Sequence, residues 1–354
     1  RAGSNLPRGV AATMANQMPL WGNSDIGVIE ADENALPELV RRIQPRVLLL
    51  LNLFRDQLDR YGELESIASD WGPVVAALPP ETTLIVNADD PNLANLAEQT
   101  HASVLRFGLD IDGISLPELP HAADAAYCRK CGARLVYTAI YLSHLGHYRC
   151  PRCDLQRPPL DARLVGVQPV GLSSQELTVD AGAHGGLRTL ELALPGLYNA
   201  YNAMGAAVAA SAFNAPWSAI DATFAAFKPA FGRFERVRLG SLDLILTLAK
   251  NPVGFNEVIR TISEAGFDGP IVIAINDLDA DGRDVSWLWD VDFELLTTLG
   301  FTHPIIAAGL RGHDLAVRMK YAGTPASRLW TDAADLPLDQ LPTFLQQHLG
   351  KSEQ

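Results

Sequence analysis

The sequence predicts an α/β protein of two domains, the first of which carries a small metal-binding insertion. Short apolar runs alternate with polar loops and helical segments in the first third of the chain, and the alternation returns near the C-terminus. Between these parts it stops in a stretch that holds every cysteine. The repeat of strand, loop and helix is typical of a parallel sheet covered on both faces. We expect the domains to span residues 1–236 and 237–354, with the insertion at 119–159.

The composition and net charge of the chain exclude some classes of protein. The chain has 354 residues, of which 48% are apolar and 19% charged, so it can form two ordinary hydrophobic cores. Its longest apolar run, residues 47–54, is too short to span a bilayer. A net charge of −13 argues against nucleic-acid binding, which needs clustered basic residues. Only four cysteines are present, which favours a reducing compartment and a cytoplasmic protein.

The first residues read like the interior of a domain. The chain begins at Arg1, without a methionine and without a basic-then-apolar leader segment. We therefore expect the sequence to be incomplete at its N-terminus.

The first apolar run, residues 26–29, predicts a strand that ends in Glu30, Asp32 and Glu33. Acidic residues at the end of such a strand are placed to hold a ligand or a metal ion. They can equally begin the helix predicted over 35–43, because carboxylates favour a helix N-terminus. Both interpretations can hold for different members, and we expect Glu30 to be the one that points inward.

The remaining elements of the first domain follow from apolar runs and helix-ending prolines. The helix after residue 63 should end before Pro79-Pro80, since proline lacks an amide donor. Strands are expected at 47–51, 83–86 and 104–107, helices at 63–78 and from 91 to about 98, a β-rich stretch at 164–194, and an alanine-rich helix at 199–213.

Two C-x-x-C pairs lie 18 residues apart in the insertion. This spacing is typical of a structural zinc ribbon, because each pair turns two thiolates toward one tetrahedral ion. Two disulfides or a redox pair are the alternative. His144 and His147 lie nearby and could each bind a metal ion, but with four thiolates available we expect them to be surface or packing histidines. The predicted zinc ligands are Cys128, Cys131, Cys150 and Cys153.

Two asparagines stand near the start of the alanine-rich helix. Asn199 and Asn202 are three residues apart and so share a face, where their amides can cap the helix or contact a ligand. The sequence leaves both options open. Residues 231–236 are interpreted as a turn between the domains.

The second domain repeats the alternation of the first. A long loop at residues 276–289 follows one of its strands and carries four aspartates, a serine and two tryptophans. It is either a polar turn whose tryptophans dock on the core or a functional loop at a strand end. An aspartate here can orient a catalytic imidazole, which must come from elsewhere because no histidine is near in sequence. Strands are expected at 242–248, 270–275 and 304–309, and helices at 254–265, 313–322 and 341–349.

Several motifs together resemble one family over essentially the whole chain. In order they are NLFRDQLDRYG (52–62), NADDP (87–91), the four-cysteine ribbon with GHY (146–148), YNAYN (198–202), KNP (250–252) and DGRD-x-SW (281–287). The same series is found in the MurT family, the Mur-ligase-like subunits of lipid II isoglutaminyl synthases. The ribbon and the DGRD-x-SW loop separate this family from other Mur ligases.

The resemblance implies a fold, a reaction and a partner. It implies a Mur-ligase-like central ATPase domain with a parallel sheet, followed by a smaller Rossmann-like α/β domain. The partner would be GatD, a glutamine amidotransferase subunit that supplies ammonia. ATP with Mg²⁺ would activate the α-carboxylate of D-glutamate in the lipid II stem peptide, at the inner face of the membrane, and ammonia would then displace phosphate.

The resemblance also implies roles for single residues. Glu30 corresponds to a Mg²⁺ ligand, Asn202 to the adenine contact and Arg233 to a phosphate contact. Asp284 corresponds to the aspartate that completes a catalytic triad with the cysteine and histidine of the partner.

The chain departs from the wider Mur-ligase pattern in several places. The glycine-rich phosphate loop should lie upstream of Arg1, and the first lysine is Lys130, so weak ATP binding by the chain as it stands is expected. Gln57 stands where Mur ligases tend to have a histidine. Thr247 and Lys250 replace the aspartate and histidine of D-Y-A-H-x-P, so ribose recognition should differ. The alternatives are another Mur or folylpolyglutamate-type ligase, or a non-catalytic zinc-ribbon interaction protein.

Overall fold

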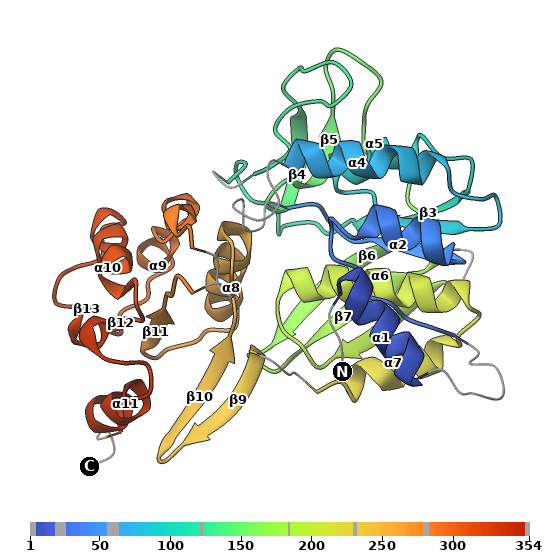
Figure 1. Cartoon of the computed structure of the whole chain (residues 1–354). Helices are drawn as coiled ribbons and strands as arrows, with labels where there is room; N and C mark the ends of the chain where they lie inside the picture. The colour runs from blue at the N-terminus through green and yellow to red at the C-terminus, as the bar shows by residue number, and fades with distance from the viewer. Residues whose placement is uncertain are drawn as a thin grey trace.

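The computed structural model shows two α/β units joined by a long β-hairpin (Figure 1). It describes residues 5–17, 26–54, 64–120, 123–182, 185–228, 232–278 and 283–350.

The first unit is built on a six-stranded sheet with the order β1-β2-β3-β6-β7-β8. Its first four strands are parallel and its last two antiparallel, which confirms the predicted parallel sheet and adds an antiparallel extension. The strands are β1 (Val47–Leu50), β2 (Thr83–Asn87), β3 (Ser103–Leu109), β6 (Ala162–Val170), β7 (Ser174–Asp180) and β8 (Leu187–Leu192).

Helices cover both faces of this sheet. Alternate side chains of β2 enter different cores: Ile85 packs in a cluster with α6, whereas Leu84 and Val86 pack against α2, α4 and α5. This period of two is what a strand buried on both faces requires. One face carries α6 (Leu197–Ala212) and α7 (Trp217–Ala225), and the other α2 (Leu36–Ile43), α4 (Leu64–Ala76) and α5 (Pro91–Ala97). A further helix, α1 (Pro7–Gln17), packs through Val10 on the start of α2.

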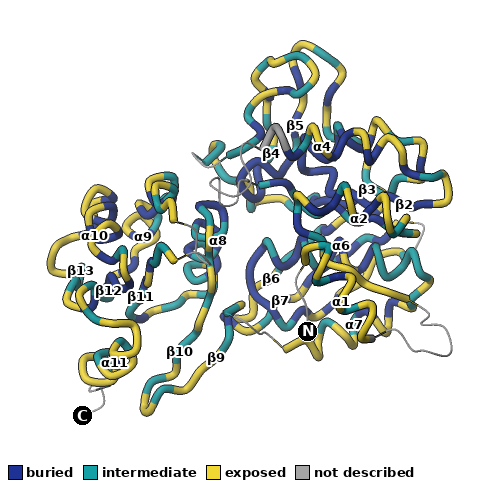
Figure 2. Tube along the Cα trace, in the orientation of Figure 1, coloured by how far each residue is buried: buried dark blue, intermediate teal, exposed yellow. Residues whose placement is uncertain are grey.

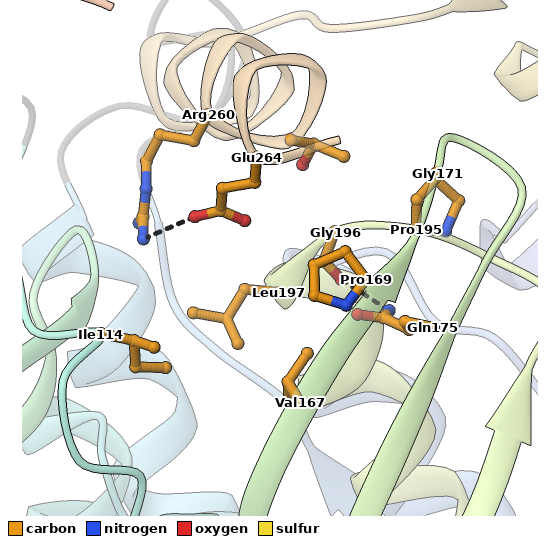
Figure 3. A pocket seen from close by; sticks show the side chains of 11 residues that line it. Ile114, Val167, Pro169, Gly171, Gln175, Pro195, Gly196, Leu197, Arg260 and Glu264 are labelled. Carbon is orange, nitrogen blue, oxygen red and sulfur yellow. Dashed lines mark hydrogen bonds and ion pairs between the residues drawn. The ribbon is translucent and has the colours of Figure 1, made fainter. Parts of the chain in front are cut away.

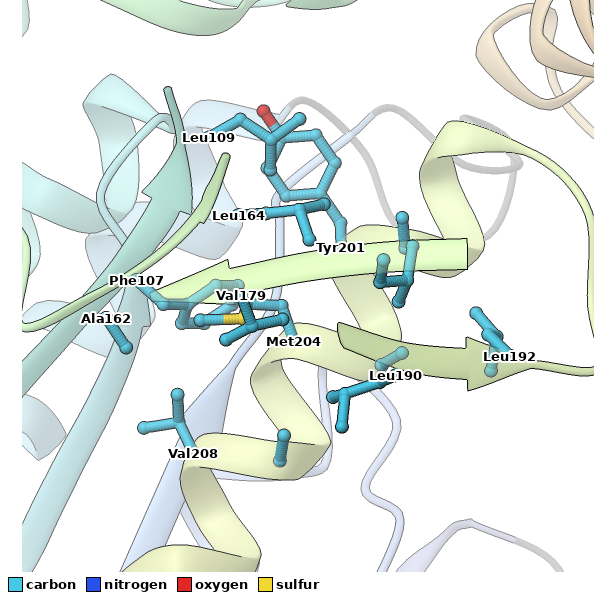
Figure 4. Close-up of a cluster of buried hydrophobic side chains, with 14 of the residues drawn as sticks. Phe107, Leu109, Ala162, Leu164, Val179, Leu190, Leu192, Tyr201, Met204 and Val208 are labelled. Atoms are coloured by element: carbon cyan, nitrogen blue, oxygen red, sulfur yellow. The ribbon is translucent and has the colours of Figure 1, made fainter. Parts of the chain in front are cut away.

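The alanine-rich helix α6 lies close against the sheet, as its small residues predict. A Cβ atom added to Gly205 would come within 2.5 Å of the Leu51 side chain and 3.1 Å of the Phe107 ring, so a larger residue would force these side chains to move. Phe107 and Met204 lie together in this cluster (Figure 4), which is part of the buried interior drawn in dark blue in Figure 2.

The cysteine-containing insertion forms a hairpin of its own. Its strands β4 (Val136–Leu142) and β5 (Leu145–Arg149) pair antiparallel and are separate from the six-stranded sheet. The predicted ribbon hairpin is thus confirmed.

Two predicted elements are wrong. Residues 26–29 form no strand, because the run has no buried face: Val28 is 95% exposed and Ile26 52%. Residues 231–236 are not mainly a turn, because β9 begins at Arg233, although both Gly232 (φ 71°) and Phe234 (φ 54°) have a left-handed backbone.

The hairpin of β9 (Arg233–Leu239) and β10 (Leu242–Thr247) leads into the second unit. The boundary expected after residue 236 lies inside β9. Beyond it, β11 (Ile271–Ala274), β12 (Ile305–Ala308) and β13 (Leu329–Trp330) form a parallel three-stranded sheet. It is accompanied by α8 (Pro252–Glu264), α9 (Leu295–Thr298), α10 (Gly312–Tyr321), α11 (Leu341–Leu349) and the 3-10 turns η2 (Ser286–Asp290) and η3 (Asp332–Asp335). The predicted second α/β unit is present.

Within the described ranges, every helix is too short or too polar to cross a bilayer.

The packing of α6 on the sheet gives a stability prediction. Phe107→Ala should lower the free energy of unfolding of the first unit by about 3–5 kcal/mol, because it leaves a cavity under α6. Leu187→Ala is the control, since Leu187 is 72% exposed, and it should change stability by less than about 0.5 kcal/mol. Urea titrations followed by circular dichroism measure both. Equal urea midpoints for the two variants would contradict this account of the core.

Candidate functional site

The four cysteines of the insertion converge on one point. Their Sγ atoms all lie within 4.8 Å of one another, and all four thiols are free rather than disulfide-bonded. The Sγ atoms of Cys128 and Cys153 are 3.4 Å apart, and so are those of Cys131 and Cys150. Tetrahedral zinc with Zn–S bonds of about 2.3 Å needs sulfurs roughly 3.8 Å apart. The donor set and its spacing therefore fit a Cys₄ zinc site.

Each C-x-x-C pair sits on a tight backbone turn. The N–H of Cys128 donates to the carbonyl of Ala133 (2.8 Å), and that of Cys150 to the carbonyl of Leu155 (2.7 Å). Desolvation opposes ionisation of Cys150, but hydrogen bonds from the N–H groups of Arg152 and Cys153 and from the thiols of Cys131 and Cys153 together lower its pKa to about 6. Burial and the neighbouring thiols raise the pKa of Cys153, so the cluster favours one thiolate, the form that binds metal, at Cys150.

The ribbon rests on α5. Leu135, Tyr148 and the cysteines share a small core with Ala94 of that helix. Two residues inside the first C-x-x-C pair reach the same helix: Arg129 Nε donates to Asn92 Oδ1 (2.9 Å), and Lys130 Nζ pairs with Glu98 Oε2 (2.6 Å). The ribbon is therefore fixed to the first unit.

The two nearby histidines serve in packing, as expected. His144 is fully buried with its ring 5.0 Å from that of Phe54. His147 packs edge-on to Tyr141 and contacts the carbonyl of Leu109 through Nε2 (3.0 Å). Among the described residues, only the cysteines form a metal-binding cluster.

The acidic residues before α2 differ in burial, and the buried one is not the residue that the sequence predicted. Asp32 is the buried member, and it organises the start of α2 by accepting the N–H of Asn34 (3.1 Å). Glu30 is exposed in an irregular segment, so the expectation that it points inward is wrong. Because residues 26–29 form no strand, no sheet edge turns Glu30 toward the interior.

The first turns of α6 hold the two asparagines in different settings. Asn199 is buried, and its amide donates to the carbonyl of Pro195 (2.6 Å), which resolves its role in favour of shaping the helix start. Asn202 is half-buried on the same face as Tyr198, one turn earlier. Burial raises the pKa of Tyr198, and the charge of Arg233 acts against this shift. Asn202 thus lies in the second turn of α6, whereas Arg233 is the exposed first residue of β9 and influences Tyr198 through its charge.

A cavity of about 330 Å³ adjoins this helix start (Figure 3). Its walls are mostly apolar, with Val167 and Leu197 on one side and Arg260 and Glu264 of α8 on the other. Gln175, which is buried, donates to the carbonyl of Gly196 (2.9 Å) and so fixes the loop before α6. The cavity therefore lies between the sheet of the first unit and a helix of the second.

Arg260 also ties the two units together. Its Nη1 donates to the carbonyl of Tyr141 in β4 (2.9 Å) and to Glu257 (3.0 Å). Burial raises the pKa of Glu257, and the positive charge of Arg260 counteracts it. The KNP motif begins this helix: Asn251 caps α8 by accepting the N–H of Gly254 (2.8 Å).

Asp284 stands on an exposed loop of the second unit. Its carboxylate accepts the N–H of Ser286 (2.8 Å), and this hydrogen bond holds the pKa of Asp284 below its ordinary value. The side chain is therefore ionised at neutral pH and open to another molecule. The following tryptophans divide between core and surface: Trp287 packs on Phe255, whereas Trp289 is 55% exposed.

Some predicted features lie outside the described residues. These are residues 55–62 of the NLFRDQLDRYG motif, including Gln57, and Asp279 and Asp281 of the acidic loop. Asp277 is described and faces Arg311, with 3.7 Å between Oδ2 and Nη1.

Sequence reasoning missed a buried ion pair beside the ribbon. Arg157 Nε donates to Asp89 Oδ1 at 2.6 Å. Asp89 belongs to the NADDP motif, which the sequence analysis uses only to identify the family. The position of this charged residue directly after a buried strand is the sequence feature that could have indicated a structural role. Nothing in the sequence singled out Arg157.

Comparison with known families supports both units. The family described as "Mur ligase middle domain" matches residues 5–122, and that described as "MurT ligase C-terminal" matches residues 248–343.

Solved structures of low sequence identity share the fold. A pseudomurein peptide ligase type C from Methanothermus fervidus superposes with a TM-score of 0.62 at 19% identity, covering 90% of this chain and 61% of that one. A folylpolyglutamate synthase from Mycobacterium tuberculosis gives a TM-score of 0.52 at 18% identity, covering 88% of this chain and 60% of that one. The chain thus spans about three fifths of the length of these ligases, and the likeness establishes a Mur-ligase-like fold.

Curated relatives extend over nearly the whole chain. The MurT subunit of a lipid II isoglutaminyl synthase (glutamine-hydrolyzing) from Streptococcus pneumoniae is 30% identical over 342 residues, which are 95% of this chain and 72% of that protein. A Staphylococcus aureus protein of the same name is 28% identical, over 90% of this chain and 70% of its own length. The chain therefore belongs to the MurT family of Mur-ligase-like proteins.

Proposed function

We propose that this chain is the ligase subunit of a lipid II isoglutaminyl synthase, which amidates the D-glutamate α-carboxylate of the stem peptide. The observation that carries this proposal is the similarity to named MurT subunits over 95% of the chain. The Mur-ligase-like fold, the four-cysteine ribbon and the exposed Asp284 are consistent with it. The reaction would take place at the cytoplasmic face of the membrane that holds lipid II.

The nucleotide would bind around the start of α6. Asn202 offers an amide that can both donate to and accept from an adenine ring, and Arg233 offers a cation for phosphate. Glu30 offers a carboxylate, the ligand type that Mg²⁺ prefers. ATP with Mg²⁺ supplies the phosphate that turns the unreactive carboxylate of the substrate into one with a leaving group. The residues of this chain would orient the two substrates and balance the charge of the phosphates.

The second unit would complete the active site of a glutamine amidotransferase partner of the GatD kind. Asp284 is ionised, exposed and held in one orientation by Ser286. A carboxylate of this kind can hold an imidazole in the tautomer that activates a cysteine. Ammonia released there would be used by the first unit, so the two reactions would depend on one assembly.

The cysteine cluster would hold a structural zinc ion. All four positions are filled by protein thiols, which leaves no open position for a substrate or a water molecule. Zinc here would stabilise the ribbon rather than take part in the chemistry.

The proposed partner role is tested by Asp284→Asn in the complex with the glutaminase. Glutamine-dependent amidation of lipid II should fall by about a thousandfold or more, because the imidazole of the partner loses its orienting charge. Ammonia-dependent amidation should change little. Asp290→Asn, at the end of the 3-10 turn η2 that follows Asp284, is the matched control for the glutamine-dependent rate. Undiminished activity of Asp284→Asn would remove this residue from the triad.

The nucleotide site is tested by Arg233→Ala. Loss of a charged hydrogen bond to phosphate should raise the KM for ATP about tenfold or more in a steady-state amidation assay. Arg236→Ala on the same exposed stretch of β9 should leave KM unchanged. The same KM in both variants would show that Arg233 does not contact the nucleotide.

The zinc site is tested by elemental analysis of freshly purified protein. One zinc ion per chain is expected, and Cys150→Ser should lose most of it because a tetrahedral site then lacks a ligand. Asp154→Asn, an exposed position beside the second C-x-x-C pair, should keep its zinc. Absence of zinc from the wild-type protein, or disulfides in its place, would overturn the assignment.

A further inference from the structure

A buried carboxylate connects the ribbon, the sheet and α6. Asp89 is fully buried at the end of β2, and its two oxygens receive hydrogen bonds from three different segments. Arg157 Nε donates to Oδ1 (2.6 Å), while the Tyr201 hydroxyl (2.6 Å) and the Leu109 N–H (2.8 Å) both donate to Oδ2.

Arg157 belongs to the ribbon side of this connection. It follows Cys153 by four residues, and its backbone N–H donates to the carbonyl of Tyr148 in β5 (2.9 Å). Its guanidinium also donates to Asp110 Oδ1 (2.9 Å) and to the carbonyl of Leu109 (2.7 Å). Each of its three guanidinium nitrogens thus has a partner, and a shift of the side chain would break at least one of these bonds.

Tyr201 belongs to the α6 side. It is 2% exposed and lies one residue before Asn202, in the second turn of the helix. Because Asp89 accepts the hydroxyl hydrogen bond, any shift of this carboxylate requires a shift of Tyr201 or the loss of a buried hydrogen bond. The position of Asn202 therefore depends on Asp89.

The space around the carboxylate allows little adjustment. A Cβ atom added to Gly108 would collide with the Asp89 side chain. Burial raises the pKa of Asp89, and Arg157 and Tyr201 act against this by favouring the charged form. Removal of either donor leaves a desolvated carboxylate with fewer partners, which is costly in a dry interior.

We propose that Arg157, Asp89 and Tyr201 are positioning residues that make the alignment of the first turns of α6 depend on the folded ribbon. The ribbon would act on the nucleotide site through this path, although its cysteines lie outside that site. The consequence for nucleotide binding rests on the proposed function. The structural connection between the ribbon and α6 rests only on the contacts described.

The link is tested by hydrogen–deuterium exchange with mass spectrometry on zinc-loaded protein. Tyr201→Phe keeps the ring and removes the hydroxyl, so amides of residues 197–204 should exchange about tenfold faster. Zinc content should stay at the wild-type level, and exchange in α10 should not change. Arg157→Ala should have the same local effect while the cysteines keep their metal.

Arg163→Ala is the matched control. Arg163 is a neighbouring arginine that pairs with Asp110 and Asp180 but has no contact with Asp89, and it is half exposed. Its removal should leave exchange in residues 197–204 unchanged. Wild-type exchange of this segment in Tyr201→Phe, or equally raised exchange throughout the first unit, would overturn the proposal.

A kinetic measurement distinguishes a role in positioning Asn202 from a role in stabilising the fold alone. In the complex with the glutaminase, Tyr201→Phe should raise the KM for ATP severalfold with little change in kcat, since Asn202 is placed to contact the base and not the reacting phosphate. A fall in kcat alone would contradict the proposed path. If the wild-type complex binds ATP but shows no ATP-dependent amidation, the proposed function fails, and the exchange experiment decides the link in either case.

Discussion

The buried carboxylate of Asp89 imposes a requirement on much of the first unit. A charged group withdrawn from water must be surrounded by donors, and these come from β3, from α6 and from the segment after the ribbon. The parallel strands deliver Asp89 to the edge where β2 ends, and the glycine at 108 leaves room for its side chain. Segments far apart in sequence thus meet at one carboxylate. The need to satisfy its hydrogen bonds favours one relative placement of these segments over other compact arrangements.

In the proposed function the two units would contribute different chemistry. The first has a sheet edge, a helix start and an adjoining cavity, where the nucleotide and the substrate would bind. The second provides an exposed, ionised aspartate on a loop that is braced by a tryptophan packed on the core. Arg260 bridges the units through the carbonyl of Tyr141, so the hairpin of the ribbon also borders the region between them.

Much of this architecture could be predicted from the sequence, and the failures have physical reasons. Buried strands such as β2 and β12 are continuous apolar runs, and the spacing of the cysteines fixes the ribbon without reference to the rest of the chain. The run at residues 26–29 has the same composition but no burial, and composition alone cannot report burial. Arg157 was missed because its role depends on Asp89, 68 residues away, and no local pattern records such a pairing.

The ribbon occupies an unusual place in the topology. Strands β3 and β6 are parallel neighbours, and the 52 residues between Leu109 and Ala162 (110–161) must carry the chain back along the sheet. In most α/β proteins a crossover helix performs this return. Here a segment that contains the hairpin of β4 and β5 does so, and closing a flexible connection of this length is entropically unfavourable. Metal capture would shorten the effective connection before β6 pairs. The pairing of β6 with β3, and not the local pairing of β6, β7 and β8, would then depend on whether the cysteines hold a metal ion.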